Sequence, residues 1–160
     1  MKKLLCLFLT IALLCSAVPV FAAEASFAGG DGTAENPYQI ATLEHLENFG
    51  EMVRSGRGDI CAILTDDIVI NEDPEASVRA GEMEDLITLT PLSVSETEPF
   101  SGTFDGNGHT ITGLYCNSYI GYEEYADGYR DYALFISVRN GGCVKNLNLD
   151  KVYLAMYSKD

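Results

Sequence analysis

"FSGTFDGNGHTITGLY" (Phe100–Tyr115) is the most patterned stretch of this chain. It sets a glycine-rich turn, "DGNG", between two short runs in which apolar and polar residues alternate. Asp105 and Asn107 tolerate unusual turn geometry, and we expect Gly106 and Gly108 to supply positive φ angles. The stretch therefore predicts a structural turn that joins two short strands.

The flanks of this turn predict which side chains face the core. In the alternating pattern, Phe104 and Ile111 would point inward from the two strands. A calcium site is the alternative for "DGNG", because Asp and Asn oxygens in a tight loop suit a hard cation. The turn lacks the longer acidic ladder of an EF-hand loop, so turn chemistry is the preferred interpretation and no metal is predicted. His109 is expected to be a polar residue at the end of the turn.

Beyond Asp59 the chain consists of short apolar runs punctuated by Gly, Asn and Asp. These include "ICAILTDDIVI", "DLITLTPL", "YALFISV" and "CVKNLNLDKVYLAMY". Such spacing predicts many short strands, and the absence of helical stretches between them argues against a doubly wound sheet. The fold classes still compatible with this pattern are a sandwich, a barrel and a β-solenoid.

The shortness of the strands and a suggested internal repeat favour the solenoid. In this repeat "GHTITGL" corresponds to "GCVKNL", with Gly108, Ile111 and Leu114 matching Gly142, Val144 and Leu147.

One helix is predicted in the mature chain, over Thr42–Arg54. Its apolar residues recur at three-to-four spacing, Thr42 is a suitable N-cap, and Gly56 follows the last turn. We expect this helix to cover the open N-terminal end of the solenoid, which would otherwise expose strand edges. The acidic segment that contains Pro74 and Gly81 is predicted to be a loop.

The N-terminus has the order of a secretory signal peptide. "MKK" is basic, an apolar run of about 15 residues follows, and small residues surround a cut expected after Ala22. The run is shorter than the roughly 20 residues that span a bilayer. A retained membrane anchor and a lipoprotein attached at Cys15 are less favoured alternatives.

The charge balance excludes some partners. The whole chain carries a net charge of −14, and loss of Lys2 and Lys3 with the leader would make it −16. An acidic surface repels phosphate backbones, so nucleic acid is not an expected partner.

Three cysteines, Cys61, Cys116 and Cys143, remain after the leader is removed. Three cannot all pair within one chain, so we interpret them as buried thiols that behave as small apolar residues. One disulfide with one free thiol is the alternative.

Taken together, these segments resemble a known family. "GGDGTAENPYQIATLEHLENF", "AILTDDIVI", "FSGTFDGNGHTITGLY" and "ALFISVRNGGCVKNLNL" are similar, in this order, to secreted bacterial cell-surface proteins with GLUG-type repeats. The resemblance implies an all-β fold: the start of a right-handed parallel β-helix with one N-terminal capping α-helix. Residues 1–22 would be the signal peptide, and residues 23–160 the cap and first rungs, incomplete at the C-terminus. The chain departs from the family at Ile136, where glycine is usual.

Catalytic patterns are weak. A zinc peptidase needs two histidines one helical turn apart, whereas His45 and His109 lie in separate segments. Glycoside hydrolysis needs two carboxylates at a set separation, and the adjacent Asp66 and Asp67 would point to opposite sides of a strand. Lys145 and Arg139 could serve a lyase, but a charged solvent face explains them more simply.

We therefore expect a secreted or cell-surface, non-catalytic scaffold or adhesion-type module without a cofactor, attached to a membrane only through its leader. The alternative is an accessory β-helix domain of a secreted enzyme, either polysaccharide-active or like immunoglobulin-A peptidases. A host or cell-surface glycan or protein is the expected partner, because aromatic residues on projecting loops suit such contacts. The predicted binding residues lie in the loop Asn117–Asp131 and are Tyr119, Tyr122, Tyr125 and Tyr129. The alternative is a loop that folds these tyrosines back onto the flank of the solenoid.

Overall fold

The computed structural model describes residues 27–93, 99–120 and 133–158 of the chain. The predicted leader and most of the tyrosine-rich loop lie outside these ranges. Within the described part, no helix has the length and apolarity that a bilayer crossing requires.

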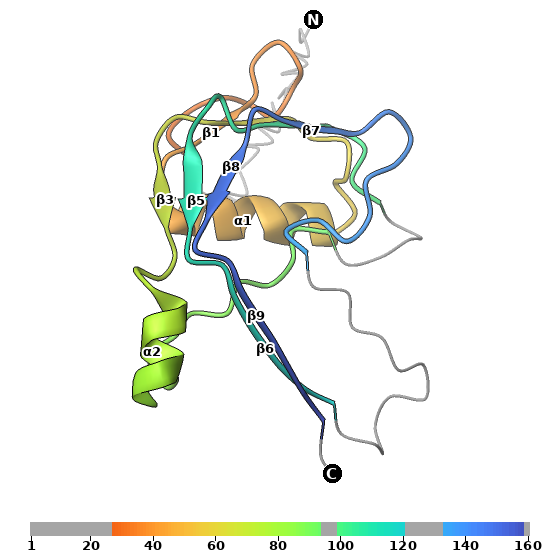
Figure 1. Cartoon of the computed structure of the whole chain (residues 1–160). Helices are drawn as coiled ribbons and strands as arrows, with labels where there is room; N and C mark the ends of the chain where they lie inside the picture. Colours follow the sequence, from red (N-terminus) through yellow and green to blue (C-terminus); the bar gives the residue numbers. More distant parts are fainter. Residues whose placement is uncertain (1–26, 94–98, 121–132, 159–160) are drawn as a thin grey trace, which may run out of the picture.

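The described residues form short strands in three parallel sheets, with two helices (Figure 1). Sheet A holds β1 (Tyr38–Ile40), β2 (Ala62–Leu64), β4 (Thr103–Asp105) and β7 (Cys143–Lys145), in that order. Sheet B holds β3 (Ile68–Val69), β5 (Thr110–Thr112) and β8 (Asn148–Asp150). Sheet C holds β6 (Tyr115–Ile120) and β9 (Tyr153–Ser158). The prediction of a mostly β chain with few helices is confirmed.

The chain visits the sheets in a repeated order. After β2 and β3 it reaches Thr88, which bridges Tyr115 of sheet C. It then forms β4, β5 and β6, and later β7, β8 and β9, so that each pass adds one parallel strand to each sheet. We call each pass a layer. The segments "DLITLTPL" and "YALFISV" contribute isolated bridges rather than the strands predicted for them.

Register between the layers stacks apolar side chains into columns. In sheet A, Ala62, Phe104 and Val144 are in register, and Phe104 is fully buried. In sheet B, Ile111 lies between Ile68 and Leu149 and is also fully buried. The inward orientation predicted for Phe104 and Ile111 is confirmed.

The register of the repeat differs from the prediction, so the predicted match of Ile111 to Val144 is wrong. Phe104 is the partner of Val144, and Ile111 is the partner of Leu149. The turn between β7 and β8 is two residues shorter than the turn between β4 and β5, which shifts the match. Parallel layers keep their strands in register and absorb such differences at the corners.

The first helix, α1 (Leu43–Arg54), has the predicted position and caps. The Thr42 hydroxyl accepts the N–H of His45, and Gly56 beyond the last turn has a φ of 97°. Its buried residues Leu46, Phe49 and Val53 face the core, and α1 runs across the stack of sheets (Figure 1). The helix therefore covers the β1 end of the core.

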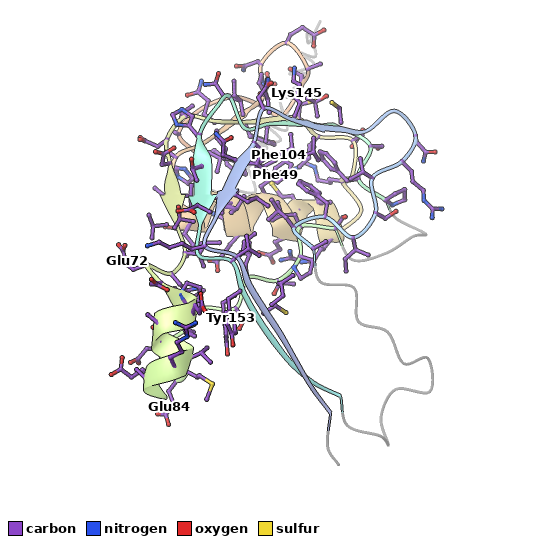
Figure 2. The ribbon with its side chains drawn as sticks, in the orientation of Figure 1. Phe49, Glu72, Glu84, Phe104, Lys145 and Tyr153 are labelled. Atoms are coloured by element: carbon purple, nitrogen blue, oxygen red, sulfur yellow. The ribbon has the colours of Figure 1, made fainter. Side chains whose placement is uncertain are left out.

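Four phenylalanine rings join α1 to the strands. The ring of Phe49 lies 6.0 Å from that of Phe100 and 5.6 Å from that of Phe104. Phe135 in turn lies 4.8 Å from Phe100 and 5.4 Å from Phe104. Figure 2 shows Phe49 and Phe104 side by side inside the stack. Tilted and edge-on contacts of this kind add to the burial of the rings themselves.

The acidic segment contains a second helix, so the loop predicted there is wrong. α2 (Pro74–Ala80) begins after Asp73, whose carboxylate accepts the N–H of Ala76, and ends at Gly81 with a left-handed φ of 79°. Pro74 at the helix start and Gly81 just past its end are the local signals for a helix. The high charge and short length of the segment obscured them.

The cysteine prediction is partly wrong. Cys61 is a buried thiol, as expected, and Cys116 is half-buried. Cys143 is exposed, because β7 lies in the last layer and its side chain points away from the Val144 column.

We expect Phe49→Ala to destabilise the fold by about 3–5 kcal/mol, because it removes a buried ring from the aromatic cluster. Val69→Ala is the matched control. Val69 is about half exposed, so its truncation should change the free energy of unfolding by less than about 0.5 kcal/mol. Urea denaturation of both variants checks this, and equal losses would contradict the assigned core.

Candidate functional site

Exposed and half-buried polar residues gather where the chain passes from sheet A to sheet B. We call this set the corner cluster, and it consists of Asp67, Asp105, Asn107, His109, Lys145 and Asn146. Its members come from three successive corners, after β2, after β4 and after β7. The parallel stacking of the layers brings these corners together.

Asp105 is the centre of the cluster. Its Oδ1 accepts hydrogen bonds from the N–H of Asn107 and from Nδ2 of Asn146, both at 2.9 Å. Its Oδ2 lies 3.2 Å from Nζ of Lys145, which stands next to it in the following layer. Both carboxylate oxygens are therefore occupied by groups of the protein.

Asp67 ties the first corner to the second. Its Oδ1 accepts the N–H of Thr110 at 2.8 Å and lies 3.2 Å from Nδ1 of His109. His109 is thus the polar residue at the turn end that the sequence predicts. Asp66 and Asp67 both lie in the exposed turn between β2 and β3, outside either strand.

Asparagine side chains make further bonds between layers. Nδ2 of Asn107 donates to the carbonyl of Leu64 at 3.3 Å, in the layer before it. Nδ2 of Asn148 donates to the carbonyl of Gly108 at 2.8 Å. These bonds satisfy carbonyl groups that the turns leave without a strand partner.

The turn "DGNG" differs from the prediction in one respect. The positive φ angles belong to Asn107 (51°) and Gly108 (83°), not to Gly106. Gly106 is needed for another reason: a Cβ there would lie 2.4 Å from Cα of Leu147. The next layer approaches this position too closely to admit a side chain.

A second corner, between sheets B and C, depends on Asn71. Its Nδ2 donates to the carbonyls of Gly113 (2.7 Å) and Ile87 (2.9 Å), and its Oδ1 accepts the N–H of Ile87. Asn71 is buried, and the sequence reasoning did not single it out. Its place directly after an apolar strand was the only signal that could have found it.

Hydrogen bonding lowers the pKa of both cluster carboxyls. For Asp105 the amide of Asn146 contributes most, followed by the N–H of Asn107 and by Lys145, while partial burial acts in the opposite direction. For Asp67 the N–H of Thr110 contributes most, with a smaller contribution from His109. A low pKa suits a carboxylate that holds layers together and does not suit a general acid.

Metal ligands and pockets were the other features of the described residues that could support catalysis. In these ranges no group of three or more histidine, cysteine, aspartate or glutamate side chains is placed to hold a metal ion. A shallow hollow of about 300 Å³ lies at the corner before β4. It is lined by Gly56, Gly58, Asp59, Pro99, Ser101 and Asn140. Its lining includes one carboxylate, whereas glycoside hydrolysis uses two.

The predicted tyrosine residues fall in different places. Tyr119 belongs to strand β6, paired with Tyr157 of β9, so its assignment to a loop is wrong. Strand β6 extends as far as Ile120 because each of its residues pairs with a residue of β9. Tyr122, Tyr125 and Tyr129 lie outside the described residues. Lys145 is about half exposed and pairs with Asp105.

Known proteins with similar sequences are much longer than this chain. A protein of Evansella cellulosilytica, provisionally described as a Gly-rich membrane protein, is 31% identical over 135 residues, covering 81% of this chain and 13% of that protein. Halomucin of Haloquadratum walsbyi is 31% identical over 85 residues, covering 53% of this chain and 1% of halomucin. No family model and no solved structure matches the chain.

The lowered pKa of Asp105 predicts a pH effect on stability. Because the folded state favours the ionised carboxyl, its stabilisation is present above the ordinary pKa of 3.8 and is lost as the pH falls below that value, through the lower folded pKa. Asp105→Asn should therefore cost about 1 kcal/mol at pH 7 and much less at pH 3. Urea denaturation of wild type and variant across this range measures the difference.

Asp66→Asn is the matched control, since none of the cluster's hydrogen bonds uses the Asp66 carboxylate. It should leave the pH profile of unfolding unchanged. If the difference in unfolding free energy between wild type and Asp105→Asn stays constant from pH 7 to pH 3, the Asp105 charge does not stabilise the corner.

A pair of glycines tests the close approach of layers at the second corner. Gly113 and Gly108 have nearly equal φ angles, 79° and 83°. A Cβ on Gly113 would lie 1.8 Å from the carbonyl oxygen of Asn71, whereas one on Gly108 would meet nothing within 4 Å. Gly108→Ala should cost about 1–2 kcal/mol for the left-handed backbone alone. Gly113→Ala should cost about 1–3 kcal/mol more, or prevent folding.

Proposed function

We propose that this chain is a secreted or cell-surface, non-catalytic scaffold module built on a parallel β-helix. The observation that carries the proposal is the repeated path through sheets A, B and C, in which each pass adds a parallel, in-register strand to each sheet. A path of this kind is the pattern of a solenoid, in which each layer contacts only its neighbours. α1 would then be the cap of the first layer.

The place of the patterned stretch in the fold supports a relationship to proteins with GLUG-type repeats. "GTFDGNGHTITGLY" spans β4, the corner after it, β5 and the start of β6, and so makes most of one layer. "CVKNLNLDKVY" makes the same part of the next layer. In this interpretation the motif is a structural unit, and its Asp, Asn and Gly residues serve the turn.

The surface location draws support from three features. The N-terminal residues have the composition of a secretory leader. The similar proteins are described as a membrane protein and as halomucin. A strongly acidic chain suits a soluble extracellular environment.

The use of the corner carboxylates supports a non-catalytic role. Asp105 and Asp67 accept two hydrogen bonds or ionic contacts each from neighbouring layers, which leaves them poorly placed to act on a substrate. The shallow hollow beside Asp59 brings only one carboxylate. A binding role would instead use the segment that begins at Tyr119, with a glycan or protein as partner.

Surface display is tested by fractionating cells of the source organism and treating intact cells with a protease. We expect the chain in the envelope or medium and cleavage of the cell-bound form, because the leader exports it. Retention in the cytosolic fraction would overturn the location. Turnover of acidic polysaccharides by the purified chain would overturn the non-catalytic role.

The binding role is tested by replacing Tyr119, Tyr122, Tyr125 and Tyr129 with serine together. If these tyrosines contact the partner, binding of the purified chain to cells or to a glycan array should fall at least tenfold, since aromatic anchors dominate such interfaces. Circular dichroism and thermal melting of the variant serve as the folding control. Unchanged binding by a folded variant would remove the tyrosines from the site.

A further inference from the structure

Of the eight large apolar side chains that are exposed among the described residues, four lie on one layer. We call β7, β8 and the first two residues of β9 the last layer, Cys143–Leu154. Val144 is 38% exposed and Leu149 is 48% exposed, although their partners in the preceding layer, Phe104 and Ile111, are fully buried. Val152 (45%) and Leu154 (56%) continue the same surface.

The last layer also presents strand edges. β7 ends sheet A, β8 ends sheet B and β9 lies at the border of sheet C. Figure 1 shows β8 at the border of sheet B, next to β5. Within the described ranges each of these strands has a paired neighbour on one side only. Edge strands with adjacent apolar side chains are ready to pair with a further strand.

The charges of the last layer indicate what that strand would carry. In the register of sheet A, Lys145 follows Asp105, and the two form an ion pair at 3.2 Å. Lys145 remains about half exposed on its other side. The layer also contains Lys151 and Asp150, so it has a small positive charge in a chain of net charge −14. A carboxylate above Lys145 would continue the alternation of charge along this column.

We propose that the last layer is a docking edge for a further parallel layer of polypeptide with apolar residues over Val144 and Leu149 and a carboxylate over Lys145. The inference rests on the proposed β-helix and deepens it by naming the surface and the chemistry of its partner. Its basis is continuity, because the same register already joins β4 to β7 and β5 to β8. The much greater length of the similar proteins is in accord with layers that continue beyond this one.

A second copy of the chain fits this edge less well. Docked through its own last layer, it would bring lysines toward Lys145 and Lys151, and two chains of net charge −14 repel each other. A separate layer that carries an acidic residue at the position of Lys145 avoids the repulsion between lysines and the repulsion between two whole acidic chains. The partner is therefore a strand-forming segment of different charge.

The exposed thiol of Cys143 provides a test of register. Neighbouring parallel strands lie about 4.8 Å apart, which is within the range of Cα separations that a disulfide bridges. The probe is a synthetic peptide that copies residues 140–154 with Lys145→Glu. Docked in register, its cysteine would lie directly over Cys143 of the full chain, and mild oxidation would join the two thiols with loss of two electrons to the added oxidant.

We expect the mixed disulfide at Cys143 to form at least about tenfold faster than with a peptide of the same composition in which the cysteine and Asn148 are exchanged. A peptide with Val144→Asn and Leu149→Asn should react as slowly as the exchanged one. A peptide that keeps lysine at position 145 should react about two- to fivefold more slowly than the acidic peptide. Mass spectrometry of the digested adduct, with a Cys143→Ser chain as control, locates the bond.

Equal rates for all peptides would overturn the docking edge, and equal rates for the acidic and lysine peptides would overturn its charge preference. Dimers of the chain itself, found by sedimentation without peptide, would replace the proposed partner with a second copy. These measurements use the purified chain and do not depend on its location. If the chain docks the peptide but stays in the cytosol, this inference stands and the proposed surface role is wrong. If the chain is displayed on the surface but does not dock the peptide, the surface role stands and this inference is wrong.

Discussion

The fold depends on one constraint: apolar side chains of successive layers must stack in a single register. Phe104 lies between Ala62 and Val144, and Ile111 lies between Ile68 and Leu149. Strands of two or three residues bury little area by themselves, so no layer is stable alone. The stacked columns, together with the rings of α1 and its neighbours, provide the common core.

The corners follow from the same constraint. Layers about 4.8 Å apart leave no room for a Cβ where one turn passes over the backbone of another, which explains Gly106 and Gly113. Where the turn faces solvent, Asn107 and Gly108 adopt left-handed backbone, and the Asn107 side chain donates to the preceding layer. The polar residues that look most like a ligand site are thus used to hold the layers together.

The two ends of the stack of layers differ in how well their apolar side chains are covered. α1 covers the first end, where Ile40 and Leu64 are fully buried. At the other end Val144 and Leu149 lie exposed, and within the described residues β7, β8 and β9 each pair with a neighbour on one side only. The carboxylates of the corner cluster are occupied by internal bonds, whereas the last layer presents exposed apolar side chains.

Local signals were sufficient for α1, for the inward residues of β4 and β5, and for the turn between these two strands. Thr42 and Gly56 marked the ends of α1, alternation marked Phe104 and Ile111 as inward, and "DGNG" marked a turn, because each of these depends on residues a few positions apart. The same kind of signal existed for α2 and was outweighed by the charge of its segment.

Only the tertiary structure decided which residues meet. Asp105 accepts a hydrogen bond from Asn146, 41 positions away in the sequence, and Asp67 accepts one from Thr110, 43 positions away. The corner after β7 is shorter than the corner after β4, so spacing in the sequence misaligned the layers. The sequence by itself therefore determined the short strands, the helix α1, the turn and the acidity. The pairing of carboxylates, the need for Gly106 and the exposure of Cys143 were decided by the stacking of layers, because contacts across about 40 residues depend on register and not on local preference.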